Sequence, residues 1–358
     1  MAEITARMIQ SLGVRSLGAL AAILVIANLA LLLVRPGRGG GARRAGLRVG
    51  LVFDVGGRGD KSFNDSAYAG VERARRELGV EVELVEPGDG ADRESGLRLF
   101  AARGFDLVIG VGFIFSDDMY EIAGEYPTTR FACVDYAKFG PQGFVVPPPN
   151  MAALKFREEQ GSFLVGALAA LVSRSKVLGF VGGMDIPLIH KFEAGYRAGA
   201  HAVCPECRVL VGYAGVTGDA FKNPSRGKEL ALTQYGGGAD IVFHAAGSTG
   251  LGVFEAARQR QRFAIGVDVD QWAEAPGRIL TSMTKQLDVA VFDTVRAVRD
   301  GTFRGGVQVF GLERAGVDYV YDERNRSLIG EAVRQRVEAQ RREIIAGRIV
   351  VPTGSEDR

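Results

Sequence analysis

Two successive series of short apolar segments, each alternating with helical segments, place the strongest constraint on the fold of this 358-residue chain. Segments typical of strands fall at 47–53, 81–85, 106–111 and 130–135, and again at 177–182, 208–213, 239–244 and 263–267. The first helical segment, over 64–78, repeats apolar residues along one face. Buried strands that alternate with helices predict parallel sheets with helices on their faces. The chain is therefore predicted to be an α/β protein with two lobes.

The rest of the chain predicts how the lobes are joined. Pro147–Pro149 and a helix expected over 153–173 separate the two series, which assigns 47–152 to the first lobe and 153–269 to the second. Further strands are expected at 278–283, 307–310 and 317–320, with helices over 286–300 and 327–346. We expect 270–358 to cross back and complete both lobes, which gives a clamp with a hinge.

The first 46 residues predict a membrane anchor and a tether. The run from Leu17 to Val34 contains one polar residue, Asn28, and at about 1.5 Å per residue it nearly spans a bilayer core. A Gly- and Arg-rich tether follows it. The arginines from Arg35 to Arg48 favour a cytoplasmic body, although long domains translocate largely regardless of charge. We expect an uncleaved N-terminal transmembrane helix and an extracytoplasmic body.

Composition narrows the classes of partner. The 44 basic and 42 acidic residues leave a net charge of +2, so nucleic acid is not an expected partner. A hydrophobic fraction of 47% is enough for a packed core. Among the three cysteines, Cys204 and Cys207 form a CxxC pair without a second pair, which excludes a four-cysteine zinc site. The pair is either a small local disulfide or two free thiols.

Glycine, acidic and aromatic residues gather directly after the predicted strands, where open parallel sheets bind ligands. These segments are Asp54–Asp65, Gly112–Asp118, Gly182–Pro187, Ala245–Gly252, Asp268–Gln271 and Ser282–Lys285. Ionised carboxylates only accept hydrogen bonds, which suits hydroxyl and N–H groups and suits a phosphate badly. Phenylalanines beside them favour a flat ligand held by stacking.

Three other chemistries are less well supported by the sequence. Gly56–Gly59 follows a strand, but its spacing is not GxGxxG and no phosphate-binding GK[ST] motif occurs. Asp268 and Asp270 are a possible pair of cation ligands without a calcium-binding loop. The histidines, His190, His201 and His244, form no catalytic motif. We therefore predict no catalytic residue, no metal and no cofactor.

The same segments resemble the basic membrane protein family, substrate-binding proteins of ABC importers of the purine nucleoside receptor type. The resemblance opens on Asp54 and on Asp60-Lys-Ser-Phe-Asn64, and continues through Gly112-Phe-Ile-Phe-Ser-Asp117. It extends in the family's order to Gly182-Gly-Met-Asp-Ile-Pro187, Ala245-Ala-Gly247 and Ile265-Gly-Val-Asp268, and covers roughly residues 47–300. It implies a type I periplasmic-binding-protein clamp.

The resemblance also implies a set of ligand-binding residues, which includes Asp54. Phe63 and Phe192 would sandwich a purine base from opposite lobes, and Asn64 and Asp117 would meet its polar edge. Asp268 would accept hydrogen bonds from the ribose hydroxyls, Lys285 would donate to them, and Gly247 would offer backbone to the sugar. An ABC permease is the implied partner.

The sequence departs from the family in its leader. Many members are lipoproteins with a cysteine just after the apolar run, whereas no cysteine precedes Cys133 here. Anchoring is therefore expected through the apolar segment itself. The departure leaves two functions open: delivery of a nucleoside to an ABC importer, or a membrane-anchored nucleoside sensor that does not transport. A nucleoside-cleaving enzyme is a third, weaker alternative.

Overall fold

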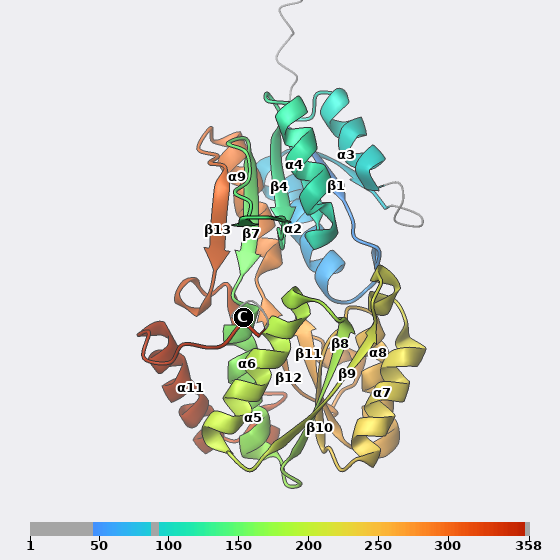
Figure 1. Cartoon of the computed structure of the whole chain (residues 1–358), viewed down its shortest axis with the longest axis vertical. Coiled ribbons are helices and arrows are strands. Elements are labelled where there is room, and N and C mark those ends of the chain that lie inside the picture. The colour runs from blue at the N-terminus through green and yellow to red at the C-terminus, as the bar shows by residue number, and fades with distance from the viewer. Residues whose placement is uncertain (1–45, 87–92, 355–358) are drawn as a thin grey trace, which may run out of the picture. The chain divides into compact units, whose positions relative to one another are not determined.

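The computed structural model describes residues 46–86 and 93–354, and both lobes lie in this part of the chain (Figure 1). The residues from Gly46 onward group into one compact unit. The anchor predicted at 17–34 lies outside the described residues. Within the two described ranges, no helix combines the length and the apolar character that a membrane span requires.

The first sheet has the strand order β13-β7-β4-β3-β1-β2, and each neighbouring pair is parallel. Its strands are β1 (Arg48–Val52), β2 (Glu81–Val85), β3 (Leu107–Val111), β4 (Arg130–Val134), β7 (Met151–Phe156) and β13 (Gly306–Phe310). Its helices are α2 (Phe63–Leu78), α3 (Arg93–Ala102), α4 (Ser116–Glu125) and α9 (Leu287–Arg299). All five residues of β3 are buried, as expected for a parallel strand covered on both faces.

Helix α2, which begins at the candidate site, shows how the sequence sets the ends of an element. Asp65 lies in its first turn, and Arg75 and Arg76 lie in its last turn, so the charges complement the helix dipole. Gly79 ends the helix in the left-handed conformation (φ 67°), which glycine adopts without strain. These signals fix where Phe63 and Asn64 enter the helix.

The second sheet has the order β14-β12-β11-β10-β8-β9, in which only the β12–β14 pair is antiparallel. Its strands are β8 (Val177–Met184), β9 (Arg208–Gly215), β10 (Ile241–Ala245), β11 (Phe263–Asp268), β12 (Ile279–Lys285) and β14 (Val317–Tyr319). Its helices are α5 (Glu158–Val172), α6 (Pro187–Val203), α7 (Pro224–Gly236), α8 (Thr249–Arg260), α10 (Arg326–Ile329) and α11 (Glu331–Ile345). The predicted two-lobed α/β class is confirmed.

The C-terminal part of the chain contributes to both sheets, since β13 joins the first sheet and β12 and β14 join the second. The helix predicted from residue 153 is wrong over its first residues, because 151–156 form strand β7 and the helix begins at Glu158. The boundary predicted at 152/153 therefore falls inside a strand. Its residues, MAALKF, favour a helix locally, but pairing on both sides with β4 and β13 overrides that preference.

Helices α5 and α6 pack closely enough to fix the start of α6, which carries a predicted site residue. A Cβ added at Gly195 would lie 2.1 Å from the carbonyl oxygen of Glu159, and one at Gly199 would lie 1.9 Å from that of Phe163. No side chain fits in either place. The glycines thus let the two backbones touch and hold Phe192 in position.

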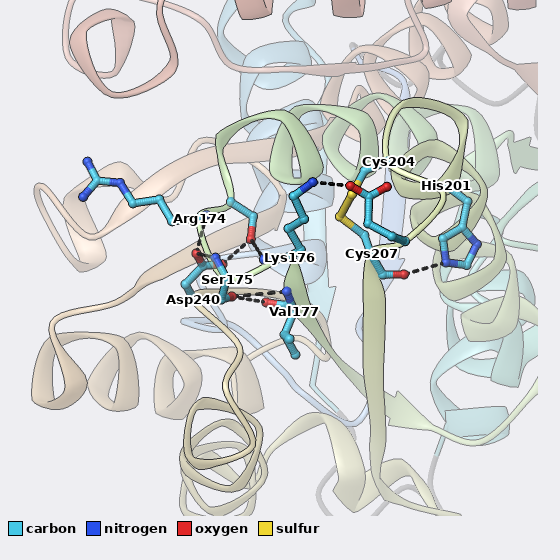
Figure 2. Close-up of a disulfide and its surroundings, with 10 residues drawn as sticks. Arg174, Ser175, Lys176, Val177, His201, Cys204, Cys207 and Asp240 are labelled. Atoms are coloured by element: carbon cyan, nitrogen blue, oxygen red, sulfur yellow. Dashed lines mark hydrogen bonds and ion pairs between the residues drawn. A yellow bond between two sulfur atoms is a disulfide. The ribbon is translucent and has the colours of Figure 1, made fainter.

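Cys204 and Cys207 form a local disulfide between the end of α6 and the start of β9 (Figure 2). Both residues are buried. The His201 ring nitrogen Nε2 lies 3.0 Å from the carbonyl oxygen of Cys207, and Lys176 pairs with Glu206 beside the bridge. Of the two alternatives left by the sequence, the structure contains the disulfide.

Candidate ligand-binding site

Loops at the carboxyl ends of strands from both sheets surround one cavity. It holds about 590 Å³ of empty space, including its opening to solvent. The predicted ligand-binding residues that line it are Asp54, Phe63, Asn64, Phe192, Gly247, Asp268 and Lys285. The first three come from the first lobe and the other four from the second. The structure therefore brings seven of the eight predicted residues together.

Asp117, the eighth predicted residue, does not line this cavity. Its side chain is 78% exposed and pairs with Lys138, whose Nζ lies 2.8 Å from its Oδ1. The loop after β3 makes a 3-10 turn over Phe113–Phe115, and α4 begins at Ser116. Phe113 lines the cavity instead. Asp117 is therefore not carried into the proposed site.

The loop from β1 to α2 is held by Asp60, a buried residue that also lines the cavity. Its carboxylate accepts hydrogen bonds from the backbone N–H groups of Ser62 (2.9 Å), Asn64 (2.8 Å) and Asp65 (3.1 Å). The Asn64 side chain donates to the same carboxylate at 3.1 Å and accepts from the Asp54 N–H at 3.0 Å. These bonds satisfy the first turn of α2 and fix Asn64 beside Asp54.

Asp54 has an unusual protonation equilibrium. Its pKa is raised to about 7, mainly by burial and also by the neighbouring Asp135 and Asp60 carboxylates, against the hydrogen bond from the Val55 N–H. Near neutral pH, Asp54 is therefore present in both protonation states. A protonated carboxyl donates a hydrogen bond and an ionised one only accepts, so this group can meet either kind of ligand atom.

Lys285 is the only cation among the described residues that line the cavity. Its Nζ donates to both carboxylate oxygens of Asp135, at 2.7 and 2.6 Å, and lies 3.0 Å from Oε1 of Glu158. Burial lowers the pKa of Lys285, but Asp135, Glu158 and Asp268 outweigh it, so the net shift is upward and the ammonium stays charged. The contact with Asp135 joins the second lobe to the first.

Asp135 was missed by the sequence reasoning, because it is the last residue of the segment expected as a strand at 130–135. In the structure β4 ends at Val134, and Asp135 follows in the left-handed conformation (φ 57°). Asp268 at the end of β11 shares this conformation (φ 65°). Non-glycine residues with positive φ are uncommon and cluster at functional sites. Both of these carboxyl groups line the cavity.

Asp268 also connects the two lobes. Its Oδ2 accepts a hydrogen bond from the Ser62 hydroxyl of the first lobe at 2.5 Å. Nearby, the Gln271 side chain donates to the Lys61 carbonyl oxygen at 2.9 Å. Burial raises the pKa of Asp268 to about 6, although Lys285 and the Ser62 hydroxyl oppose the increase. The lobes are thus in contact through groups that border the cavity.

Four phenylalanines line the cavity, two from each lobe: Phe63, Phe113, Phe192 and Phe221. Phe192 is 4% exposed, whereas Phe63 is only partly buried and lies at the start of α2. Phe221, in the turn after β9, was missed, although it follows a predicted strand. Aromatic walls from opposite lobes suit a flat ligand.

His244 lies close to the cavity without lining it. It is buried in β10, and its Nε2 is 3.1 Å from Oε1 of Gln271. Burial lowers the pKa of His244 to about 4, so the ring is neutral near physiological pH. Within the described part of the chain, no group of three or more His, Cys, Asp or Glu residues is arranged to hold a metal ion.

The structure has two α/β lobes with mainly parallel sheets, and both lobes line one cavity at the ends of their strands. This arrangement defines the class of solute-binding clamps. A solved solute-binding protein of an ABC transporter from Aeropyrum pernix K1 has this fold. It superposes with a TM-score of 0.78 at 30% sequence identity, over 87% of this chain and 95% of that one. This neighbour and a second one, from Conexibacter woesei DSM 14684 (TM-score 0.69, 25% identity, over 86% of this chain and 99% of that one), are solute-binding proteins, not enzymes.

The chain belongs to the Bmp family, described as ABC transporter substrate-binding protein PnrA-like, whose model matches residues 47–355. The resemblance inferred from the sequence is thereby confirmed. A Lactococcus lactis relative named ABC transporter nucleoside-binding protein BmpA is 29% identical over 87% of this chain and 91% of its own length. An uncharacterized lipoprotein of Pyrococcus abyssi is 36% identical over 76% of this chain and 69% of its own. The protein is a substrate-binding protein of the ABC-transporter type.

Proposed function

We propose that this protein captures a purine nucleoside between its lobes and delivers it to an ABC importer. The observation that carries the proposal is that Phe63 and Phe192, from opposite lobes, line one cavity together with Asp268 and Lys285. An aromatic pair offers two faces to a flat base, and the charged pair offers an acceptor and a donor to sugar hydroxyls. The name of the Lactococcus relative supports the same ligand class.

The charges around the cavity argue for a neutral ligand rich in hydrogen-bond donors. The carboxyl groups that line it belong to Asp54, Asp60, Asp135 and Asp268. The single lysine among the described lining residues is already bonded to Asp135. A phosphorylated ligand would meet several carboxyl groups and one cation whose charge is already balanced by Asp135 and Glu158, so a nucleoside fits better than a nucleotide.

Calorimetric titration of the purified full chain, solubilised in mild detergent, tests the ligand class. The panel contains adenosine, guanosine, inosine, cytidine, uridine and adenosine monophosphate. We expect binding of at least one purine nucleoside, and tighter binding of that nucleoside than of its monophosphate. Failure to bind any nucleoside would overturn the proposal, and turnover of a bound nucleoside would place the protein among enzymes.

The proposed delivery requires a body outside the cytoplasm, held at the membrane by the N-terminal segment. The disulfide between Cys204 and Cys207 supports this location, because disulfides persist in oxidising compartments. Named lipoproteins among the relatives support anchoring. A reporter fused after Arg358 should be active only outside the cytoplasm. Cells without this protein should lose uptake of labelled nucleoside; unchanged uptake would favour a sensor.

A further inference from the structure

A second cavity adjoins the first and has no role in the proposed function. It holds about 670 Å³ of empty space, including its opening, and shares Phe113, Asp135 and Leu188 with the first cavity. Its other lining residues are Tyr136, Ala137, Phe139, Lys155, Phe156, Glu158, Ile186, Pro187 and Lys191. The two cavities therefore lie side by side, with these three residues between them.

The walls of the second cavity are mainly apolar and aromatic. Phe139, on the short β5 (Phe139–Gly140) and β6 (Gly143–Phe144) hairpin, is 54% exposed, which is unusual for so large an apolar side chain. Tyr136 is fully buried, yet its hydroxyl has no hydrogen-bond partner among the described residues. Buried polar groups in native proteins are nearly always satisfied. An apolar occupant would cover Phe139, whereas the Tyr136 hydroxyl lies too deep in the wall to meet it.

The charged groups that line the second cavity are already engaged, and Lys155 Nζ among them lies 4.3 Å from the centre of the Phe144 ring. Lys191 Nζ lies 2.6 Å from Oε2 of Glu158 and donates to the Phe156 carbonyl oxygen at 2.8 Å. Asp135 is bonded to Lys285 by both carboxylate oxygens. The second cavity therefore needs no counter-charge from an occupant. This favours a neutral group over an ionic one.

We propose that the second cavity is a subsite for a neutral, apolar or aromatic substituent of the ligand whose polar part lies in the first cavity. The proposal rests on the proposed function, because it assigns the first cavity to a nucleoside. Phe113, Asp135 and Leu188 line both cavities and place the subsite directly beside that site. A substituted nucleoside would then bind with its extension between the start of α6 and the β5–β6 hairpin.

Two substituted analogues of adenosine test the subsite by calorimetry on the full chain. N6-benzyladenosine extends the ligand from the base, and 5′-benzylthio-5′-deoxyadenosine extends it from the sugar. We expect at least one of them to bind within tenfold of adenosine. If both bind more than tenfold more weakly than adenosine, the second cavity does not accept an extension of the ligand and the inference fails.

Variants that touch only the second cavity locate the effect. Ala137 lines the second cavity and not the first, so Ala137→Trp should fill the second cavity. The variant should bind the tighter-binding analogue at least tenfold more weakly, and its affinity for adenosine should change less than twofold. Phe139→Ala, at an exposed position where folding is not at risk, should lower the affinity for the same analogue about threefold. Leu99→Ala, at a similarly exposed position in α3 that lines neither cavity, is the matched control and should change nothing.

The outcomes separate the subsite from the function on which it rests. Unchanged affinity of the better analogue in both Ala137→Trp and Phe139→Ala would overturn the subsite while adenosine binding stands. If Ala137→Trp fails to fold, Phe139→Ala decides alone. Failure of wild-type protein to bind adenosine would count against the proposed function itself and would remove the basis of the subsite.

Discussion

The two lobes meet the cavity in different ways. In the first lobe, the bonds of Asp60 stay within its own loop, so Asn64 and Asp54 are held in place without help from the other lobe. In the second lobe, Asp268 and Lys285 bond across the cleft, to Ser62 and Asp135. The first lobe thus presents a preorganised surface, whereas the site residues of the second depend on contacts with the first lobe. Changes in the second lobe should therefore affect lobe association as well as ligand contacts.

The largest expected effect follows from the loss of the cation that joins the lobes. Lys285→Met would leave Asp135 and Glu158 buried without this partner, and breaking a buried ion pair costs about 3–5 kcal/mol. Urea denaturation should show a loss of that order. Lys176→Met, which breaks the exposed pair with Glu206 beside the disulfide (Figure 2), is the control and should have little effect. Equal effects of both variants would contradict the bridging role of Lys285.

In the first lobe, the loss of a buried charge should increase stability, because keeping the Asp54 carboxylate buried lowers the free energy of unfolding. The pKa of Asp54 is about 7 in the folded protein against an ordinary value of 3.8. Between these values the folded state binds the proton more tightly, so stability falls as pH rises. Asp54→Asn, which retains an oxygen to accept the Val55 N–H, should be more stable than wild type at pH 8, by up to about 4 kcal/mol.

The difference should become small near pH 4, where Asp54 is neutral in the folded protein and its ordinary pKa of 3.8 is reached in the unfolded chain. Thermal denaturation of the ligand-free protein at a series of pH values measures it. A stabilisation that is the same at pH 4 and pH 8 would show that the substitution acts through packing and not through the charge of Asp54.

The next effect concerns the ligand contact expected from the second lobe. Asp268→Asn should lose charge-assisted hydrogen bonds to the sugar, each worth about 1.5–3 kcal/mol, so nucleoside affinity should fall at least tenfold. Because the pKa of Asp268 is about 6, wild-type affinity should also decrease as pH falls through that value. Titrations between pH 5 and pH 8 should show a smaller pH dependence in the variant. An identical pH dependence would assign the titration to another group.

Substitution of Phe63 and of Phe192 allows a direct comparison of the two lobes. Phe63→Ala and Phe192→Ala should each weaken nucleoside binding by about 1–3 kcal/mol, by analogy with base stacking on aromatic side chains. Phe192 is buried, so its variant should also lose stability, whereas the Phe63 variant should lose less. Calorimetry and thermal denaturation of both variants separate the two effects. Wild-type affinity in both would exclude stacking in this cavity.

The fold could be predicted from the sequence because its strands are buried and bounded by turns. The strands of both series match the structure closely, and five of the six segments named after them contribute residues to the cavity, the exception being Gly182–Pro187. Strand β7 could not be identified, because MAALKF favours a helix until it pairs with β4 and β13. The double pairing arises only when the C-terminal segment returns to the first sheet.

The site was less predictable than the fold, because strand ends alone do not say which way a side chain points. Asp135 was taken as part of a strand, although its left-handed backbone turns its carboxylate to Lys285. Phe113 and Asp117 lie in one motif, yet the 3-10 turn between them brings only Phe113 to the cavity. Local turn geometry decides which of these side chains face the cavity, and residue spacing in the sequence does not predict that geometry.

The smallest expected effect tests this last distinction. Asp117→Ala should change nucleoside affinity less than twofold, because the carboxylate is exposed and bonded to Lys138 outside the cavity. Asp268→Asn, measured in the same titrations, shows that a lining carboxylate behaves differently. A tenfold loss in the Asp117 variant would mean that the lobes close further on the ligand than the structure shows. The first lobe would then not be as preorganised as its hydrogen bonds indicate.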